Sequence, residues 1–199
     1  MPEDRRREAP AAPVAPEPGS IADTFAALLP GVELNPIQGA RDVLLNVSRD
    51  DIHKVLEVAK NDPKLKMDFL RDLCGVDWEA EGLEVVYQLY SYSLKHHVTV
   101  KVRLATEDAH IQSATDLWNA ADWHERECRD MFGIVFEGHP NLVPILLPED
   151  MLDHYPLRKD NPLAPLEEWQ GTNLGDNMGS AGHIPPGSGI EVKASAESE

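Results

Sequence analysis

The chain has 199 residues, enough for one domain with a core of its own, and it carries a formal net charge of −17, with 18 Lys and Arg against 35 Asp and Glu. Because nucleic-acid binding depends on basic groups that neutralise phosphates, this balance argues against a nucleic-acid partner and against adsorption to anionic lipid. With only two cysteines and no apolar run near the ~18–20 residues that span a bilayer, we expect a cytoplasmic protein without a disulfide framework and without direct membrane insertion.

The first part of the chain predicts a leader, a helix, a strand and a second helix. Residues 1–20 are rich in Pro, Ala and Glu without apolar periodicity or an apolar signal region, which predicts a disordered leader. Apolar residues at helical spacing predict a helix over 21–29, and 42–47 predicts a short buried strand. Ser48 and Asp51 form a capping-box pattern ahead of the next helix. The apolar face of that helix consists of Ile52, Val55, Leu56 and Ala59.

The middle of the chain contains the clearest strands. Residues 67–73 first predict a further helical turn. Side chains then alternate in character over 83–90 and 98–104, and a turn at 93–96 joins these two segments. The second segment has one apolar and one polar face, which is typical of an antiparallel hairpin with one face in water. We therefore expect a β-hairpin here.

Helices are predicted again after the hairpin. A short one is expected over 114–119, with Ser113 as its cap. Asp122 followed three residues later by Glu125 is a capping-box pattern, and Gly133 stands where a helix commonly stops. The sequence therefore predicts a second, highly charged helix between these positions.

This order of elements implies an α+β fold over 21–137, in which helices pack on one face of a small mixed sheet that contains the hairpin. Beyond it, 138–163 has five prolines and a strongly apolar run at 142–147, which predicts an extended, proline-broken C-terminal arm. Such a segment cannot readily bury itself in the core of its own domain, so we expect it to dock on another subunit and to become ordered there. Residues 164–199 are rich in Gly, Asn, Ser and acids and predict a flexible tail.

The charged helix and the C-terminal arm carry a series of spaced motifs. In chain order these are Glu125-Arg126-Glu127, Asp130-Met131-Phe132-Gly133, Gly138-His139-Pro140-Asn141-Leu142, Ile145-Leu146-Leu147-Pro148 and Pro156-Leu157-Arg158-Lys159-Asp160. Together they closely resemble the signature of the C subunit of respiratory NADH-quinone oxidoreductase (complex I), most strongly over 122–162 and more weakly back to about residue 21. The chain departs from the family at Val143-Pro144, where members usually have a basic pair.

The resemblance implies a hydrophilic-arm subunit, without a cofactor of its own, of a proton-translocating NADH-quinone oxidoreductase. Such a subunit structurally supports electron transfer from NADH through iron–sulfur clusters to quinone, while FMN and the clusters lie in other subunits. It packs against the quinone-site subunit related to the large subunit of nickel–iron hydrogenases, near iron–sulfur subunits, and is peripheral on the cytoplasmic face of the bacterial membrane. The signature and interface residues that it implies are Glu125, Arg126, Glu127, Asp130, Phe132, Gly133, His139, Pro140, Leu146, Pro148, Arg158, Lys159 and Asp160.

The residues themselves also predict no cofactor site. Cys74 and Cys128, more than fifty positions apart, cannot supply the four thiolates that an iron–sulfur cluster normally takes. No G-x-G-x-x-G dinucleotide motif follows a strand. His124 and Cys128 have a spacing at which they can ligate zinc, but no further ligand of suitable spacing precedes His139. We therefore expect neither a metal nor an organic cofactor in this chain.

The charged helix also permits a catalytic interpretation. Glu127 and Asp130 can share one helical face and could act as an acid–base pair in a free-standing soluble enzyme. Arg126 and Arg129 are, however, placed to hold both carboxylates ionised in salt bridges. The pattern therefore favours a structural charge network, and we expect no catalytic residue in this chain.

The residue patterns and the family resemblance both indicate a chain whose role is to bind other subunits. Arg158 and Lys159, at the far end of the C-terminal arm, suit contacts with carboxylates of a partner, and the apolar run supplies burial. The sequence leaves open the equivalent subunit of a membrane-bound hydrogenase or of a ferredoxin- or coenzyme-driven quinone reductase. A single chain does not reveal which electron-input subunits accompany it.

Overall fold

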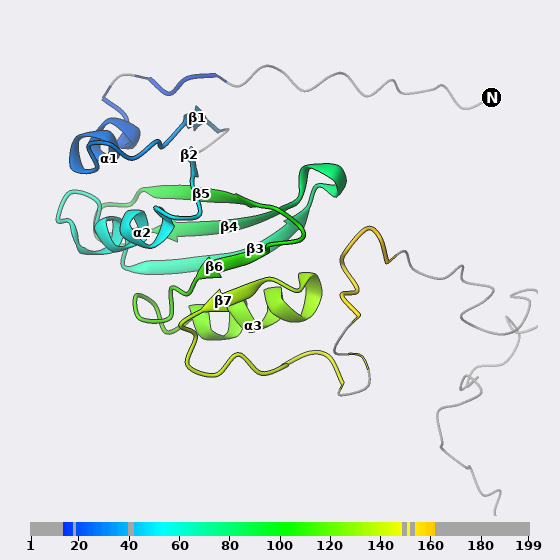
Figure 1. Cartoon of the computed structure of the whole chain (residues 1–199). Helices are drawn as coiled ribbons and strands as arrows, with labels where there is room; N and C mark the ends of the chain where they lie inside the picture. The colour runs from blue at the N-terminus through cyan, green and yellow to red at the C-terminus, as the bar shows by residue number, and fades with distance from the viewer. Residues whose placement is uncertain (1–13, 18, 40–41, 149–150, 152–153, 162–199) are drawn as a thin grey trace, which may run out of the picture. The chain divides into compact units, whose positions relative to one another are not determined.

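The computed structural model describes residues 14–17, 19–39, 42–148, 151 and 154–161, which contain three α-helices and two sheets (Figure 1). The helices are α1 (Ile21–Leu28), α2 (Ile52–Asn61) and α3 (Ala121–Phe132). The strands are β1 (Pro36–Gln38), β2 (Val43–Val47), β3 (Phe69–Asp77), β4 (Leu83–Tyr90), β5 (His97–Leu104), β6 (His110–Gln112) and β7 (Val135–Glu137), and a short 3-10 turn, η1 (Glu79–Glu81), joins β3 to β4. The predicted tail, 164–199, and most of the predicted leader lie outside the described residues.

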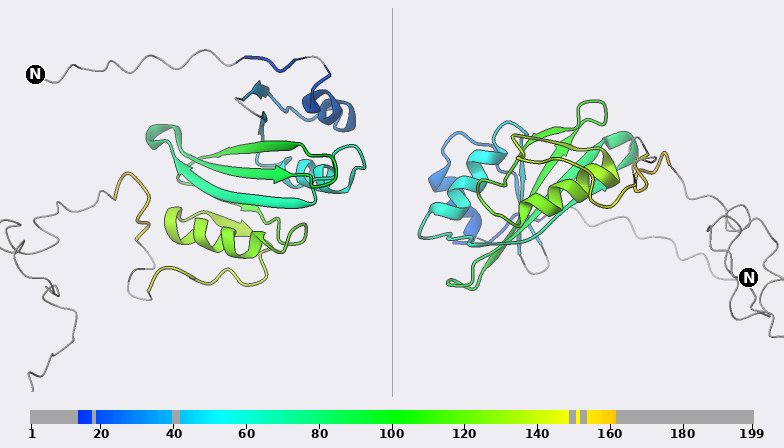
Figure 2. Two further views of the ribbon diagram at one scale, coloured as in Figure 1. Left: turned by 180° about the vertical axis from the view of Figure 1, so that it is seen from behind. Right: turned by 90° about the horizontal axis from the view of Figure 1, so that it is seen from below.

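The main sheet has five strands in the order β1-β2-β5-β4-β3. β2 pairs with β5 in parallel and the other neighbours are antiparallel, so the sheet is mixed, as predicted. β4 and β5 form the predicted hairpin, in which Tyr87 lies opposite Val100. β6 and β7 make a separate two-stranded parallel sheet. These findings confirm an α+β fold with a small mixed sheet and a hairpin, and Figure 2 shows α3 lying along the sheet.

The two faces of the hairpin have opposite characters. The core side of β4 consists of Leu83, Val85, Tyr87 and Leu89, which form one apolar cluster with buried residues of all three helices. On the opposite side, the Glu84 carboxylate lies 3.3 Å from Lys101 Nζ and 3.4 Å from Arg103 Nη2. The apolar side chains of the hairpin are excluded from water on its core side. The helices therefore cover that side.

The helical turn predicted over 67–73 is wrong, because this segment enters β3. The register between β3 and β4 shifts between Leu70 and Asp72, which marks a β-bulge. The bulge brings Leu70 and Leu73, three positions apart, both into the core. An apolar pair at that spacing imitates the helical period, which explains why the sequence pattern favoured a helix.

The short helix predicted over 114–119 is also wrong, since these described residues form a turn closed by hydrogen bonds to the Ala114 carbonyl. Tertiary contacts hold the turn: the Trp118 indole N–H donates to the main chain ahead of β3 at 3.2 Å. Ser113 caps no helix, because its hydroxyl donates to the Glu125 carboxylate at 2.7 Å. Local propensity is overridden here by long-range hydrogen bonds.

The predicted helix end at Gly133 is confirmed, whereas neither of the two predicted capping boxes forms. Gly133 ends α3 with a φ of 74°, in the left-handed region that favours glycine. At α2, Asp51 is the residue before the helix, and the Ser48 hydroxyl donates to the Asp51 carboxylate at 2.8 Å instead of capping a main-chain N–H. α3 begins at Ala121 without a side-chain cap, because Glu125 turns into the core.

Candidate interaction surface on helix α3 and the C-terminal arm

The carboxylate of Asp130 fixes the backbone of the C-terminal arm, which the structure describes over residues 138–148, 151 and 154–161. Asp130 is 2% exposed, and its Oδ2 accepts hydrogen bonds from the N–H of Ile145 (2.8 Å), Leu146 (2.8 Å) and Leu147 (3.3 Å). Burial raises the pKa of this carboxyl, but the amide donors outweigh burial and hold the pKa below its ordinary value. Asp130 is therefore ionised and anchors three consecutive residues of the C-terminal arm.

Arg126, one helical turn before Asp130, is a second anchor. Its Nε donates to Val143 O at 2.9 Å and its Nη2 donates to Pro144 O at 3.3 Å. The prediction that Arg126 holds carboxylates in salt bridges is therefore wrong, whereas the predicted pair of Arg129 and Asp130 is present at 3.5 Å. The planar guanidinium presents several N–H donors and so suits adjacent carbonyls. Although Val143-Pro144 departs from the family pattern, this contact uses backbone atoms alone.

The end of α3 holds the far end of the C-terminal arm. Arg158 Nε donates to Phe132 O at 2.6 Å, and the N–H of Leu157 donates to Met131 O at 3.2 Å, so two of the last helical carbonyls have partners. The Arg158 guanidinium also lies 4.6 Å from the centre of the Tyr155 ring. The sequence predicted that Arg158 contacts a carboxylate of a partner, but its side chain bonds to its own chain.

Lys159 likewise contacts residues of its own chain. Its N–H donates to Asp77 Oδ2 at 2.9 Å, a bond that lowers the pKa of Asp77. Its Nζ lies 3.3 Å from Glu79 Oε1 in η1. The C-terminal arm is thereby joined to the connection between β3 and β4, and not only to α3. Asp160, the last residue of the signature, is exposed.

At the near end, Glu125 and His139 are buried together. Glu125 is 0% exposed, and its carboxylate accepts from the Ser113 hydroxyl and from the Ala114 N–H, both at 2.7 Å. The His139 side chain is fully buried as well, and its Nε2 lies 3.2 Å from Asp122 O and 4.0 Å from Glu125 Oε2. The signature residues at this end join the turn before α3 to the first residues of the C-terminal arm.

Phe132 serves packing between α3 and the sheet. It is 8% exposed, and a Cβ placed on Gly75 of β3 would come within 2.5 Å of Phe132 Cδ2. The aromatic ring thus lies against the strand backbone where no larger residue fits. This close approach brings α3 directly onto the edge strand β3.

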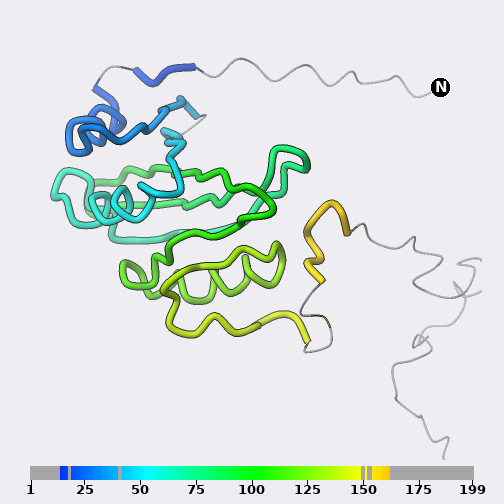
Figure 3. The backbone as a smooth tube through the Cα atoms, viewed as in Figure 1, coloured from blue at the N-terminus to red at the C-terminus, as the bar shows by residue number. Residues whose placement is uncertain are grey.

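The C-terminal arm runs beside α3 in the direction of the helix. His139 lies at the helix start, and Arg158 lies at its end. The yellow segment in Figure 1 and Figure 3 follows α3 along its length. This differs from the expectation that the C-terminal arm is ordered only by a partner, because its own domain supplies the polar groups that fix its backbone.

Several large apolar side chains of these two elements are exposed. Trp123 on α3 is 67% exposed, and Val143, Leu146 and Leu157 on the C-terminal arm are 45%, 57% and 55% exposed. Buried centres of protein interfaces are rich in such side chains, with Trp prominent among hot spots. The remaining exposed signature residues are Glu127, Pro140, Pro148, Lys159 and Asp160. Arg126, Asp130 and Arg158 bond to the main chain of their own domain, whereas the large apolar side chains named above face outward. This arrangement makes α3 and the C-terminal arm a candidate interaction surface.

The catalytic interpretation finds no support in this geometry. Glu127 is exposed, whereas Asp130 is buried with one oxygen occupied by amides, so the two carboxylates do not line one accessible site. Cys128 donates its thiol to Leu73 O at 3.8 Å, and burial raises the pKa of this thiol well above its ordinary value. Within the described ranges, no three His, Cys, Asp or Glu side chains gather as a metal site. The lack of a cofactor stays a prediction.

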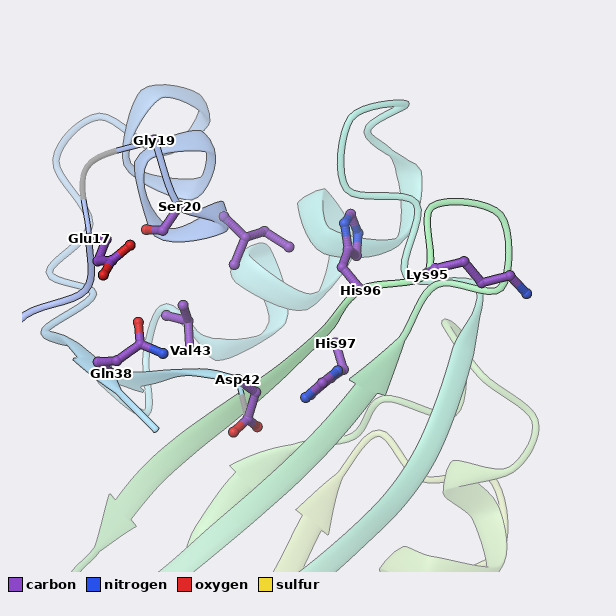
Figure 4. A pocket seen from close by; sticks show the side chains of 10 residues that line it. Glu17, Gly19, Ser20, Gln38, Asp42, Val43, Lys95, His96 and His97 are labelled. Atoms are coloured by element: carbon purple, nitrogen blue, oxygen red, sulfur yellow. The ribbon is translucent and has the colours of Figure 1, made fainter. Parts of the chain in front are cut away.

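A hollow of about 640 Å³ lies apart from this surface, between the start of α1, β2 and the loop before β5. Figure 4 shows Asp42 and His97 close together at the starts of two neighbouring strands, with Glu17 and Ser20 across the hollow. No signature residue lines it. The hollow is therefore not part of the surface that α3 and the C-terminal arm form.

Sequence reasoning missed three residues that complete the surface. Tyr155 packs on the end of α3, and Asp77 accepts a hydrogen bond from the Lys159 N–H. Trp123 is the most exposed aromatic residue of α3. A tryptophan on the polar side of a charged helix is a signal that could have pointed to Trp123. Tyr155 and Asp77 carry no such signal, because their partners lie far away in sequence.

Comparisons with known proteins agree with this description. A family model described as the 30 kDa subunit of respiratory-chain NADH dehydrogenase matches residues 45–167, which is more than half of the chain. The NADH-quinone oxidoreductase C subunit of Roseiflexus castenholzii is 43% identical over 146 residues, covering 72% of this chain and 83% of that protein. The C subunit of Acidothermus cellulolyticus is 35% identical over 162 residues, covering 77% and 83%.

Two solved structures are similar in fold. One belongs to the membrane-bound sulfane sulfur reductase, an archaeal respiratory membrane complex; it has a TM-score of 0.64 and 28% identity, and the match covers 76% of this chain and 88% of that one. The other is a trypsin-resistant fragment of Nqo5, with a TM-score of 0.51 and 30% identity, covering 61% and 96%. The resemblance seen in the sequence is thereby confirmed: the chain belongs to the family of the 30 kDa subunit of respiratory-chain NADH dehydrogenase, which is the family of the NADH-quinone oxidoreductase C subunit.

Proposed function

We propose that this chain is a cofactor-free, hydrophilic-arm subunit of a proton-translocating NADH-quinone oxidoreductase and that it has no catalytic residue of its own. The observation that carries the proposal is that three polar signature side chains bond within their own chain. Arg126, Asp130 and Arg158 all bind main-chain atoms of their own chain. A catalytic acid, base or electrophile needs a polar atom within reach of a substrate, and these side chains are committed to holding the C-terminal arm.

Such a subunit holds its neighbouring subunits in a fixed position relative to one another. Electrons pass from NADH through iron–sulfur clusters to quinone, and FMN and the clusters lie in other subunits. Reactive sites tolerate only small displacements of their supporting residues. A C-terminal arm whose backbone is anchored along α3 loses little conformational freedom when it docks, so more of the interface energy remains for binding.

The partner in this proposal is the quinone-site subunit related to the large subunit of nickel–iron hydrogenases, with iron–sulfur subunits nearby. Trp123, Val143 and Leu146 offer the exposed apolar area that such an interface buries. The chain would lie peripherally on the cytoplasmic face of the bacterial membrane, held there by other subunits. In the part of the chain that the structure describes, no helix has the length and hydropathy to cross a bilayer.

A second candidate is the equivalent subunit of another respiratory membrane complex, such as a membrane-bound hydrogenase or a ferredoxin- or coenzyme-driven quinone reductase. The observation that favours it is the fold similarity to a chain of the membrane-bound sulfane sulfur reductase. The two candidates differ in the subunits that deliver electrons. Affinity purification of the native complex followed by mass spectrometry separates them, because an NADH-oxidising flavoprotein subunit accompanies the chain only in the first.

The proposal is tested by charged substitutions on the exposed side of the surface. Trp123→Asp and Leu146→Asp place a carboxylate in the proposed interface, whereas Leu94→Asp, at a 44% exposed site in the loop between β4 and β5, is the matched control. We expect the first two variants to lower the amount of assembled membrane complex on native gels while turnover per assembled complex stays normal. The control should change neither. Wild-type amounts of complex with quinone reduction abolished would overturn the structural role.

A further inference from the structure

Glu125 lies at the meeting point of three segments. It projects from α3, its carboxylate accepts from Ser113 and Ala114 in the turn before the helix, and it lies 4.0 Å from His139 at the start of the C-terminal arm. Its side chain is fully buried. A carboxyl buried at such a junction is uncommon unless its charge is paired or neutralised.

The hydrogen bonds of His139 define the tautomer of its imidazole ring. The N–H of Asn141 donates to His139 Nδ1 at 3.0 Å, so Nδ1 is the unprotonated acceptor of the ring. The proton therefore sits on Nε2, which donates to Asp122 O at 3.2 Å and lies 3.4 Å from Asp122 Oδ1. While the bond from Asn141 is intact the imidazole is neutral, and it offers Glu125 no full positive charge.

Among the residues that the structure describes, the other groups that face Glu125 do not supply a cation either. The Tyr87 hydroxyl approaches from β4, buried and without a hydrogen-bond partner among the described residues. Cys128 lies on α3 beside the same site, and Asp122 and Asp116 add negative charge. Burial raises the pKa of Glu125 to about 7, the two hydrogen bonds from the turn offset part of that effect, and the two neighbouring aspartates add to it.

The surroundings of Glu125 accommodate a proton. A protonated Oε2 can donate to Ser113 Oγ, and Ser113 Oγ can in turn donate to Thr115 Oγ1, 2.8 Å away. The Ala114 N–H continues to donate to Oε1. Thr115 is partly exposed, so this short chain of hydroxyls also connects the buried carboxyl to water. The hydrogen bonds that Glu125 makes with the turn are then kept without a charge on its buried carboxyl.

We infer that Glu125 is a proton-binding site whose occupancy sets how firmly the start of the C-terminal arm, His139–Asn141, is held against α3. With the proton bound, the junction is neutral and closed. When the proton leaves to water, an anion remains in a buried site without a cation, and separation of the turn and the C-terminal arm from α3 relieves its desolvation. The attachment of His139–Asn141 to α3 therefore weakens as the pH rises toward neutrality and levels off above it.

The experiment measures hydrogen exchange of the full-length chain between pH 5.5 and 8, corrected for the intrinsic pH dependence of exchange. In the wild type we expect protection of the amides of His139 and Asn141, which donate to Phe136 O and to His139 Nδ1, to fall about tenfold or more across this range. In Glu125→Gln, whose amide keeps the shape and cannot ionise, protection should be independent of pH. Glu127→Gln, at an exposed position on the same helix, is the control and should behave as the wild type.

Two further measurements keep the inference testable if Glu125→Gln folds poorly. The side-chain carboxyl carbon of Glu125, followed by NMR in the wild-type chain, should titrate near neutral pH; titration near the ordinary value of a carboxyl overturns the inference. In His139→Gln the Glu125 signal should still titrate near neutrality. Loss of the pH-dependent protection in His139→Gln, together with its persistence in Glu125→Gln, would assign the effect to the histidine and also overturn the inference.

Discussion

The Tyr155 ring lies directly over Gly133, the residue that ends α3. A Cβ placed on Gly133 would come within 2.6 Å of Tyr155 Cζ, and the φ of Gly133 is 74°. Glycine is therefore needed twice at this position, for the backbone conformation and for the space above it. The contact ties the end of the helix to the end of the C-terminal arm, some twenty positions later in the chain.

Gly133→Ala should lower the free energy of unfolding by about 2–3 kcal/mol, because it adds left-handed strain of roughly 1 kcal/mol to a steric clash with Tyr155. Urea denaturation of the full-length chain measures the loss. Tyr155→Ala is the partner in a double-mutant cycle: it removes the clash but not the strain, so the double variant should lose less than the sum of the single variants. Strictly additive losses would mean that the ring does not lie over Gly133.

Asp130→Asn should cost about 2–3 kcal/mol of stability, because the three arm amides exchange an anionic acceptor for a neutral carbonyl oxygen, and the new N–H₂ then faces the Arg129 guanidinium. Because the folded state lowers the pKa of Asp130, its contribution is present above the ordinary pKa of an aspartate and is lost as the pH falls through the lowered value. Acid denaturation curves should therefore be shallower for Asp130→Asn than for the wild type. Glu127→Gln, exposed one turn earlier, should change stability by less than ~0.5 kcal/mol.

Arg126→Ala should reduce assembly of the membrane complex more than it reduces turnover of the complexes that do form. The two carbonyls that Arg126 binds lie in the apolar part of the C-terminal arm, so removal of the guanidinium frees Val143 and its neighbours from α3. Arg126→Lys keeps the charge but not the planar fork and should restore assembly only in part. Equal assembly in all three proteins, quantified by native gel and immunoblot, would show that Arg126 does not act through the C-terminal arm.

The sequence predicted those parts of the fold that local periodicity encodes. The hairpin of β4 and β5 followed from alternation, and α2 followed from an apolar face that the structure buries completely. The first part of β3 was mistaken for a helical turn because a bulge sets Leu70 and Leu73 three positions apart on one face. The three-residue strands β1, β6 and β7 are too short to produce a period of any kind.

The candidate site was predictable in its members but not in their partners. The signature named Asp130 and Arg126, yet the sequence favoured ion pairs within the helix, whereas the structure pairs both with the backbone of the C-terminal arm. Every residue has a backbone C=O and every residue except proline has an N–H, so a contact with them leaves no mark in the sequence. For the same reason the inward turn of Arg158 toward Phe132 O could not be foreseen.

The stability of the chain should depend on pH through Glu125. Folding raises the pKa of Glu125 from 4.5 to about 7, so the folded chain binds a proton more tightly than the unfolded chain between these values. The free energy of unfolding should therefore decrease as the pH rises from 4.5 to about 7 and then level off, by roughly 3 kcal/mol at most. Asp130 acts in the opposite sense at lower pH, so the two carboxyls together predict a stability maximum on the acid side of neutrality. Urea denaturation at half-unit pH steps should show this decrease in the wild type and in Glu127→Gln, and Glu125→Gln should lack it; a decrease of equal size in Glu125→Gln would assign the effect to other groups.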